Sequence, residues 1–201
     1  MMGLVRLIAT PVLHACFFIE VIGADRVPAT GPVILAPNHT SYLDPFAVTY
    51  PMRRPVYYLA WHKLFQVPLL KWLIPRLGAV PVDTDKRTDR GAYAAALSLL
   101  GEGKLLCVFP EGIRGWDGKP NALQSGVGRL AASSGATVVP VWIDGAITAW
   151  PRWRMLPRPF VPIRVRFLEP IVPKGDHAHA KDEAERIRSA ILAAYWSASA
   201  A

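Results

Sequence analysis

Short apolar runs alternate with longer amphipathic segments along most of the chain. The apolar runs are typical of buried strands and cover residues 33–36, 56–60, 79–82, 105–109, 138–143 and 163–167. Segments with helical spacing of apolar positions lie between them or after them, over residues 44–49, 62–76, 88–100, 123–133 and 182–196. Because strands that alternate with helices build layered sheets, the pattern predicts a single α/β domain with a mostly parallel or mixed sheet flanked by helices.

The N-terminal segment departs from this alternation. Residues 4–22 are mostly apolar, but Arg6, Pro11, His14 and Glu20 interrupt the run before it reaches the roughly 20 residues that a membrane-spanning helix needs. We therefore expect residues 4–18 to form an amphipathic helix at a membrane interface, kinked near Pro11, with packing on the protein's own core as the alternative. Residues 1–22 would then form a membrane-associating segment and residues 23–201 the main domain.

The chain is both apolar and basic. Hydrophobic residues make up 52% and charged residues 19% of the 201 positions, and the formal net charge is +8. The mean hydropathy is +0.23. A nucleic-acid-binding domain usually spreads its cations over a polar face, whereas many cations here stand among Trp, Leu and Pro. The composition therefore favours an anionic membrane surface over nucleic acid as the partner.

The cysteines and one histidine pair argue against disulfides and metals. Cys16 and Cys107 each lie in an apolar run, and two isolated thiols make neither a disulfide framework nor a metal site, so we expect a reducing compartment. His177 and His179 stand beside Asp176 in a polar stretch, which is typical of a solvated turn before a helix. We therefore predict no metal site.

The strongest chemical signal follows the first apolar run. His39 and Asp44 stand five positions apart, and Asp44-Pro45 is typical of a helix N-cap followed by proline. A carboxylate that holds an imidazole can make it a base for a hydroxyl near neutral pH. No serine or cysteine nucleophile motif stands nearby, so the hydroxyl would belong to the substrate. The alternative is that Asp44 only caps the helix and that His39 is an ordinary loop histidine.

A second loop follows the fourth apolar run, at Phe109-Pro110-Glu111-Gly112-Ile113-Arg114-Gly115. Gly112 permits close approach of a ligand to the backbone, and Arg114 can bind a phosphate through two parallel hydrogen bonds. Glu111 adds a carboxylate, although Glu111 and Arg114 alone would make a surface ion pair of little energetic weight. Since active-site loops of α/β sheets lie at the carboxyl ends of strands, we expect both loops in one site.

Together these loops resemble the motifs of the glycerophospholipid acyltransferases, typified by 1-acylglycerol-3-phosphate acyltransferase. Asn38-His39-Thr40-Ser41-Tyr42-Leu43-Asp44 looks like that family's His-x4-Asp motif, and residues 109–114 look like its Phe-Pro-Glu-Gly-Thr-Arg motif. Residues 77–83 and Val139-Pro140-Val141 resemble two further blocks of the family. The order and spacing agree from about residue 20 to about residue 170.

The resemblance implies transfer of an acyl group to a lipid hydroxyl, with acyl-CoA or acyl carrier protein as co-substrate and no other cofactor. His39 would be the general base and Asp44 would orient it, so that the hydroxyl attacks the thioester without an acyl-enzyme. The acceptor would be a lysophospholipid, with lysophosphatidic acid first, in phospholipid biosynthesis. The implied substrate-binding residues are Asn38, Ser41, Glu111, Gly112, Arg114, Lys86 and Arg87.

Three positions around the acceptor depart from the family pattern. Ile113 stands where the family has Thr, Gly115 where it has Ser, and Thr84 where an Arg commonly serves the acceptor phosphate. Lys86 or Arg87 would substitute for that Arg. The alternatives for the function are acylation of another lysolipid or a glycolipid, hydrolysis of acyl-CoA, and lipid binding without catalysis.

Aromatic, basic and leucine residues mix in two further segments, residues 61–77 and 150–158. The second segment contains Trp150, Arg152, Trp153, Arg154, Met155 and Arg158. Such mixtures suit the headgroup layer of a membrane or a groove for an acyl chain, although core packing explains many of the Leu positions equally well. We expect a peripheral protein on the cytoplasmic face of the cell membrane.

Overall fold

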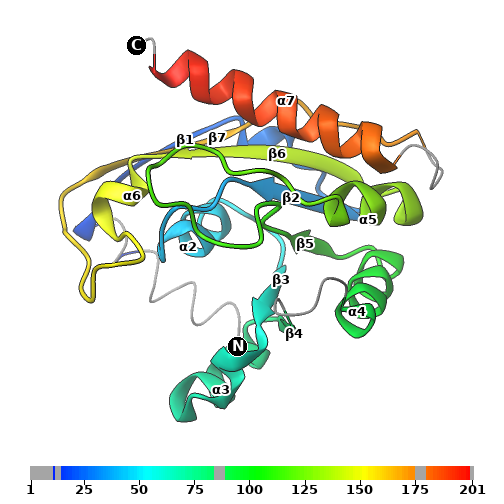
Figure 1. The fold of residues 1–201 in the computed structure, drawn as a ribbon, viewed down its shortest axis with the longest axis horizontal. Helices are drawn as coiled ribbons and strands as arrows, with labels where there is room; N and C mark the ends of the chain where they lie inside the picture. The colour runs from blue at the N-terminus through cyan, green and yellow to red at the C-terminus, as the bar shows by residue number, and fades with distance from the viewer. Residues whose placement is uncertain (1–10, 12–14, 84–88, 175–179, 200–201) are drawn as a thin grey trace.

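A seven-stranded sheet lies at the centre of the protein (Figure 1). The computed structural model describes residues 11, 15–83, 89–174 and 180–199. The strands are β1 (Phe18–Ile22), β2 (Val33–Pro37), β3 (Val56–Trp61), β4 (Ala79–Val82), β5 (Leu105–Cys107), β6 (Thr137–Asp144) and β7 (Pro162–Phe167). Their order across the sheet is β1-β7-β6-β2-β5-β3-β4. All neighbours are parallel except β6 and β7, so β1 and β7 run opposite to the rest of the sheet.

Helices cover both faces of this sheet. The α-helices are α2 (Asp44–Thr49), α3 (Pro68–Arg76), α4 (Arg90–Gly101), α5 (Gly126–Ser134), α6 (Ala146–Ala149) and α7 (Ala180–Ser199), and the 3₁₀ segments are η1 (Ala24–Arg26) and η2 (His62–Gln66). One apolar core joins α2 and α6 to the face that carries Leu35. A second core joins α4, α5 and α7 to the face that carries Ile34. Figure 1 shows α7 along one face and α2 on the other.

The sequence pattern predicted an α/β sheet flanked by helices, and the structure confirms this architecture. The central strands β2 and β5 are buried on both faces, which explains their uninterrupted apolar runs. Most predicted ends differ from the observed ends by a few residues, and two predicted elements differ further. The run over residues 105–109 leaves the sheet after Cys107, and the helix predicted over residues 62–76 divides before Pro68. Proline favours the first turn of a helix because it lacks the N–H that such a position leaves unpaired.

The N-terminal segment joins the sheet earlier than predicted. Most of residues 4–18 lie outside the described residues, but Phe18–Ile22 form β1 at the edge of the sheet, paired in parallel with β7. The side chains of β1 alternate between exposed and half-buried, and three of its residues, Ile19, Val21 and Ile22, are β-branched, as is typical of an edge strand. The last five residues of the segment predicted to associate with the membrane, residues 18–22, thus belong to the sheet, and the membrane association of the segment stays a prediction. No helix in the described part of the chain is long and apolar enough to cross a bilayer.

Candidate active site

Two loops meet at the carboxyl ends of the adjacent strands β2 and β5. These strands pair in parallel, with Leu35 opposite Cys107, so the loops that follow them leave the sheet at the same edge. The first, which we call the catalytic loop, leads from β2 into α2, and the second leads from β5 towards α5. Two hydrogen bonds join the loops at His39, whose N–H donates to Glu111 Oε1 at 2.8 Å and whose carbonyl oxygen accepts from the Gly115 N–H at 2.8 Å. The two motifs found in the sequence therefore lie together.

His39 and Asp44 form a hydrogen-bonded pair. His39 Nδ1 lies 2.9 Å from Asp44 Oδ2, and the imidazole stacks on the Phe109 ring with the centroids 3.9 Å apart. The Asp44 side chain is fully buried, whereas 14% of the His39 side chain is exposed. Because an ionised carboxylate only accepts hydrogen bonds, the pair holds the ring proton on Nδ1, and Nε2 keeps its lone pair for a substrate proton. This arrangement suits general-base catalysis.

Asp44 is held by the loop that precedes it rather than by the helix that it begins. Its Oδ2 also accepts from the N–H groups of Thr40 and Ser41, at 2.7 Å each. The sequence predicted Asp44 as the N-cap of α2, but Asp44 is the first helical residue and Leu43 occupies the cap position. The prediction was wrong because the carboxylate turns back toward the catalytic loop. This orientation fixes the carboxylate against the imidazole.

The second carboxylate oxygen of Asp44 is buried and has no hydrogen-bond partner among the described residues. Burial, and then the negative charge of Asp44, raise the pKa of the Cys107 thiol, and burial raises the pKa of Tyr58 well above its ordinary value. The Tyr58 hydroxyl donates to the Pro45 carbonyl oxygen at 3.0 Å. A protonated His39 would compensate an ionised, buried Asp44 across their hydrogen bond.

Glu111 faces inward and connects the two loops. Its side chain is buried, with Oε1 accepting from the His39 N–H and Oε2 from the Asn121 N–H at 3.0 Å. Burial raises the pKa of this carboxyl, and hydrogen bonds from the His39 and Asn121 main chain and from the Asn121 side chain act against the rise. The sequence placed Glu111 against the substrate, whereas the structure directs its oxygens at His39 and Asn121. Glu111 therefore positions His39, and its contact with substrate stays a prediction.

Asn38 and Ser41 also direct their polar groups at the main chain. The Asn38 amide donates to the Ile143 carbonyl oxygen at 3.0 Å and accepts from the Ile143 N–H at 2.7 Å. Ser41 Oγ donates to the Trp150 carbonyl oxygen at 2.8 Å and accepts from the Leu43 N–H at 3.0 Å. Both residues are buried. The sequence proposed them for substrate binding, but these contacts attach the catalytic loop to β6 and to the segment after α6.

Arg114 lies half-buried at the rim of the site. Its guanidinium carbon lies 3.9 Å from the centroid of the Tyr42 ring, and its Nε is buried without a partner among the described residues. Burial lowers the pKa of Arg114, and the positive charge of Arg152 adds to the decrease. No ion pair joins Arg114 to Glu111 in the described part of the chain. The surface ion pair between Glu111 and Arg114 that the sequence suggested therefore does not stabilise this loop.

The other predicted residues contribute less to the described site. Gly112 has φ +71°, which favours glycine, and a Cβ there would lie 2.9 Å from Gln124 Nε2. Lys86 and Arg87, and with them Thr84, lie outside the described residues, as do the histidines of the polar stretch near residue 178. The described residues contain no group of three or more His, Cys, Asp and Glu side chains that could hold a metal ion.

Residues to which the sequence assigned no role at the site complete it. Phe109 supports the imidazole from its stacked face. Asn121 bonds Glu111 through its main-chain N–H, and the Trp150 carbonyl oxygen accepts from the Tyr42 N–H at 3.1 Å. Every residue except proline supplies such an N–H, so the sequence carries no signal for these main-chain contacts. The Asn121 side chain also hydrogen-bonds Glu111. The sequence places Phe109 in the second motif, but nothing in the motif indicates its contact with the imidazole.

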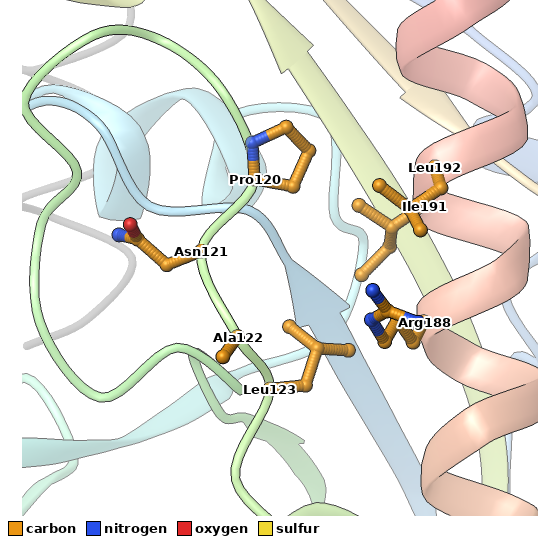
Figure 2. A pocket seen from close by; sticks show the side chains of 7 residues that line it. All are labelled: Pro120, Asn121, Ala122, Leu123, Arg188, Ile191 and Leu192. Atoms are coloured by element: carbon orange, nitrogen blue, oxygen red, sulfur yellow. The ribbon is translucent and has the colours of Figure 1, made fainter.

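A cavity of about 130 Å³ lies between the second loop and α7 (Figure 2). It is lined by Pro120, Asn121, Ala122, Leu123, Arg188, Ile191 and Leu192. In Figure 2 the Asn121 side chain points away from α7. Neither His39 nor Asp44 lines this cavity, so it is separate from the proton-transfer pair.

The chain is similar to proteins of a known family. The Acyltransferase family model matches residues 18–144. A 1-acyl-sn-glycerol-3-phosphate acyltransferase of Borreliella burgdorferi is 30% identical over 126 residues, which cover 61% of this chain and 50% of the relative. The chloroplastic 1-acyl-sn-glycerol-3-phosphate acyltransferase LPAT1 of Arabidopsis thaliana is 26% identical over 142 residues, which cover 70% of this chain and 40% of the relative. The chain thus spans about half the length of these relatives or less.

A solved structure shares the fold. The crystal structure of the 1-acyl-sn-glycerophosphate (LPA) acyltransferase PlsC from Thermotoga maritima superposes with a TM-score of 0.82 at 23% identity. The superposition covers 100% of this chain and 80% of that chain. The seven-stranded sheet and its flanking helices therefore have a counterpart in a solved acyltransferase structure.

Proposed function

This chain belongs to the Acyltransferase family, and we propose that it transfers a fatty acyl group from acyl-CoA or acyl carrier protein to the free hydroxyl of a lysophospholipid. The observation that carries the proposal is the 2.9 Å contact between His39 Nδ1 and Asp44 Oδ2, which leaves Nε2 to accept a proton. A protein that only binds lipid has no use for an imidazole oriented by a buried carboxylate.

The proposed reaction is a direct transfer. The acceptor hydroxyl gives its proton to His39 Nε2 as its oxygen attacks the carbonyl carbon of the thioester. The tetrahedral intermediate then breaks its carbon–sulfur bond, and the leaving thiolate takes the proton back from His39. The products are an ester and a free thiol, without an acyl-enzyme. Asp44 stabilises the imidazolium between the two steps.

We assign lysophosphatidic acid as the first acceptor to test. The two relatives described above are named as acyltransferases of 1-acyl-sn-glycerol-3-phosphate. Arg114 stands at the rim with an unpaired Nε, and a guanidinium can bind a phosphate through parallel hydrogen bonds. The family pattern has Thr and Ser where this chain has Ile113 and Gly115, so no hydroxyl group flanks Arg114 here. The acceptor headgroup would therefore be held by arginine without those hydroxyl groups.

We place the protein at an anionic membrane surface, on the cytoplasmic side. Large apolar side chains are exposed on α3 and in the segment between α6 and β7, including Leu69, Trp72, Met155 and Leu156. In Figure 1 both elements project on the side of the sheet opposite α7. The net charge of +8 adds attraction to anionic lipid. Met155→Asp should weaken flotation with phosphatidylglycerol liposomes, and undiminished flotation would argue against this surface.

The proposed function is tested by incubating the purified chain with palmitoyl-CoA and a panel of acceptors. The panel holds lysophosphatidic acid, lysophosphatidylglycerol, lysophosphatidylcholine and monoacylglycerol, with CoA release followed by thiol assay and lipid product by mass. Palmitoyl acyl carrier protein replaces palmitoyl-CoA in a parallel series. We expect phosphatidic acid from lysophosphatidic acid, and none with His39→Ala.

Three other outcomes of this experiment have distinct meanings. Thioester consumption that no acceptor accelerates would make the protein a hydrolase. Product from a different lysolipid would keep the chemistry of His39 and Asp44 and replace the acceptor. Lipid binding without thioester consumption from either donor would contradict the proposed function.

A further inference from the structure

Two arginines lie close together at the edge of the active site, where the positive charge of Arg152 acts on the guanidinium of Arg114. Arg152 Nη1 donates to the Arg114 carbonyl oxygen at 3.1 Å. Each guanidinium stacks on a ring, with Arg114 3.9 Å from the Tyr42 centroid and Arg152 4.1 Å from the Trp116 centroid. Trp116 in turn stacks on Trp153, with centroids 5.9 Å apart and rings 5° from parallel. We call these side chains the arginine rim.

The two cations of the arginine rim have no acidic partner in the described part of the chain. Neither Arg114 nor Arg152 takes part in the ion pairs found there. The Nε of Arg114 is buried and unpaired, and after burial the charge of Arg152 further lowers the pKa of Arg114. Two like charges with unused donors are unfavourable side by side, and an anion bound to both would offset that cost.

The arginine rim is attached to the loop that carries the base. Tyr42 belongs to the catalytic loop, three positions after His39, and its N–H donates to the Trp150 carbonyl oxygen at 3.1 Å. On the other side, Gly115 follows Arg114 and donates its N–H to the His39 carbonyl oxygen at 2.8 Å. An anion held by both guanidiniums would therefore be anchored to the same loop as the imidazole.

We propose that Arg152 joins Arg114 in binding the phosphate monoester of the acceptor and makes the enzyme select a dianionic headgroup. This inference rests on the proposed acyl transfer to a lysophospholipid. A phosphate monoester carries about −1.5 to −2 charge near neutral pH and three acceptor oxygens, enough for two guanidiniums. A phosphodiester headgroup has one negative charge and fewer free oxygens. The family pattern commonly has an Arg for the acceptor phosphate where this chain has Thr84. Arg152, in the segment after α6, would supply that second cation instead.

The aromatic stacks make this second cation rigid. A free arginine side chain loses rotamer freedom when it binds a ligand, which weakens binding. Arg152 is already held between the Trp116 ring and the Arg114 carbonyl oxygen. The planar guanidinium keeps further N–H groups for an anion, since it has five donors and the main-chain contact uses one of them.

The kinetic test compares Arg152→Ala with the wild type on three acceptors: lysophosphatidic acid, lysophosphatidylglycerol and monoacylglycerol. For lysophosphatidic acid, KM should rise about tenfold to a hundredfold with kcat nearly unchanged, because a charged hydrogen bond to the ground state is lost. KM for monoacylglycerol should not change. Arg152→Lys keeps the positive charge but not the parallel N–H donors, so its KM for lysophosphatidic acid should lie between those of the wild type and Arg152→Ala. This variant also keeps the test valid if Arg152→Ala folds poorly.

Arg129→Ala is the matched control for loss of a stacked arginine. Arg129 lies on α5, with its guanidinium carbon 6.0 Å from the Tyr93 centroid, and this variant should keep the wild-type KM for all three acceptors.

Two measurements that need no turnover separate headgroup recognition from other roles. Titration with sn-glycerol 3-phosphate, followed by calorimetry, should show affinity that falls in Arg152→Ala and in Arg114→Ala but not in Arg129→Ala. Flotation with phosphatidylglycerol liposomes should be equal for Arg152→Ala and the wild type. If no acceptor is acylated but headgroup binding still depends on Arg152, the proposed function fails while this anion site stands.

Three results would overturn the proposal. An equal rise of KM for all three acceptors would make Arg152 a structural residue. Loss of liposome flotation in Arg152→Ala would make it a membrane-binding residue. Unchanged KM and unchanged headgroup affinity in Arg152→Ala, together with a large loss when Lys86 and Arg87 are both replaced by Ala, would place the second cation in residues 84–88.

Discussion

The catalytic loop and the arginine rim belong to one site but are built in opposite ways. In the catalytic loop Asn38, Ser41 and Asp44 are buried, and their polar groups bond mainly to the main chain. In the arginine rim Trp116 is 63% and Trp153 57% exposed, and most contacts join side chain to side chain.

This difference separates chemistry from selectivity. Hydrogen bonds to main-chain groups persist when neighbouring side chains change, so substitutions elsewhere should change the geometry of His39 and Asp44 little. Contacts within the arginine rim depend on the identity of each side chain, so we expect substitutions there to alter which headgroup binds. The sequence agrees with this division, because the His-x4-Asp motif matches the family pattern whereas Ile113 and Gly115, which flank Arg114, depart from it.

Loss of His39 should have the largest effect on activity. His39→Ala removes the base, so kcat for acyl transfer should fall about 10²- to 10⁴-fold in initial-rate assays. Liposome flotation and thermal midpoint should stay close to wild type. His62→Ala is the matched control, because His62 also faces a carboxylate, with Nδ1 3.6 Å from Asp83 Oδ1. Near-wild-type rates with His39→Ala would remove the catalytic loop from the mechanism.

Asp44→Asn keeps the shape of the side chain and removes its charge. The neutral amide no longer stabilises an imidazolium, so kcat should fall about 10²- to 10³-fold. The amide also places an NH₂ group in the buried surroundings of Asp44, or against the Thr40 and Ser41 N–H groups, and the free energy of unfolding should drop by about 1–3 kcal/mol. Steady-state kinetics and urea denaturation measure the two effects. A variant with unchanged kcat would show that the carboxylate has no role in the reaction.

Glu111→Gln distinguishes positioning from substrate contact. An amide cannot accept from both the His39 and the Asn121 N–H groups with its two heteroatoms, so the loops should separate slightly and kcat should fall about tenfold or more. KM for lysophosphatidic acid should change little. Asp117→Asn, at an exposed carboxylate of the same loop, serves as the control. A raised KM with unchanged kcat would restore Glu111 to the acceptor-binding role that the sequence suggested.

The smallest expected effect concerns the thiols and leaves activity untouched. Cys107 is fully buried, and burial and Asp44 raise its pKa, so its thiol stays protonated at mildly alkaline pH where a free cysteine begins to ionise. Iodoacetamide should therefore label Cys16, which is half-buried, before Cys107. Peptide mass spectrometry of the native protein reads this order. Rapid labelling of Cys107 would reveal local opening beneath the catalytic loop.

The sequence predicted contacts between side chains better than contacts with the main chain. It paired His39 with Asp44 from their spacing, and the structure places them 2.9 Å apart. It missed the direction of Glu111, because two partners of that carboxylate are main-chain N–H groups that almost any residue could supply. It also missed β1. This edge strand is half-exposed, and its short alternation of apolar and polar residues is hard to distinguish from the apolar segment that precedes it.

The central claim is that His39 activates the acceptor hydroxyl for direct attack on the thioester. Its most direct test is rapid-quench measurement of CoA release from palmitoyl-CoA, with and without lysophosphatidic acid, alongside the intact mass of the protein. We predict that fast CoA release requires the acceptor, matches lipid product in amount, and leaves the protein unacylated. A burst of CoA with acylated protein before the acceptor is added would contradict the claim.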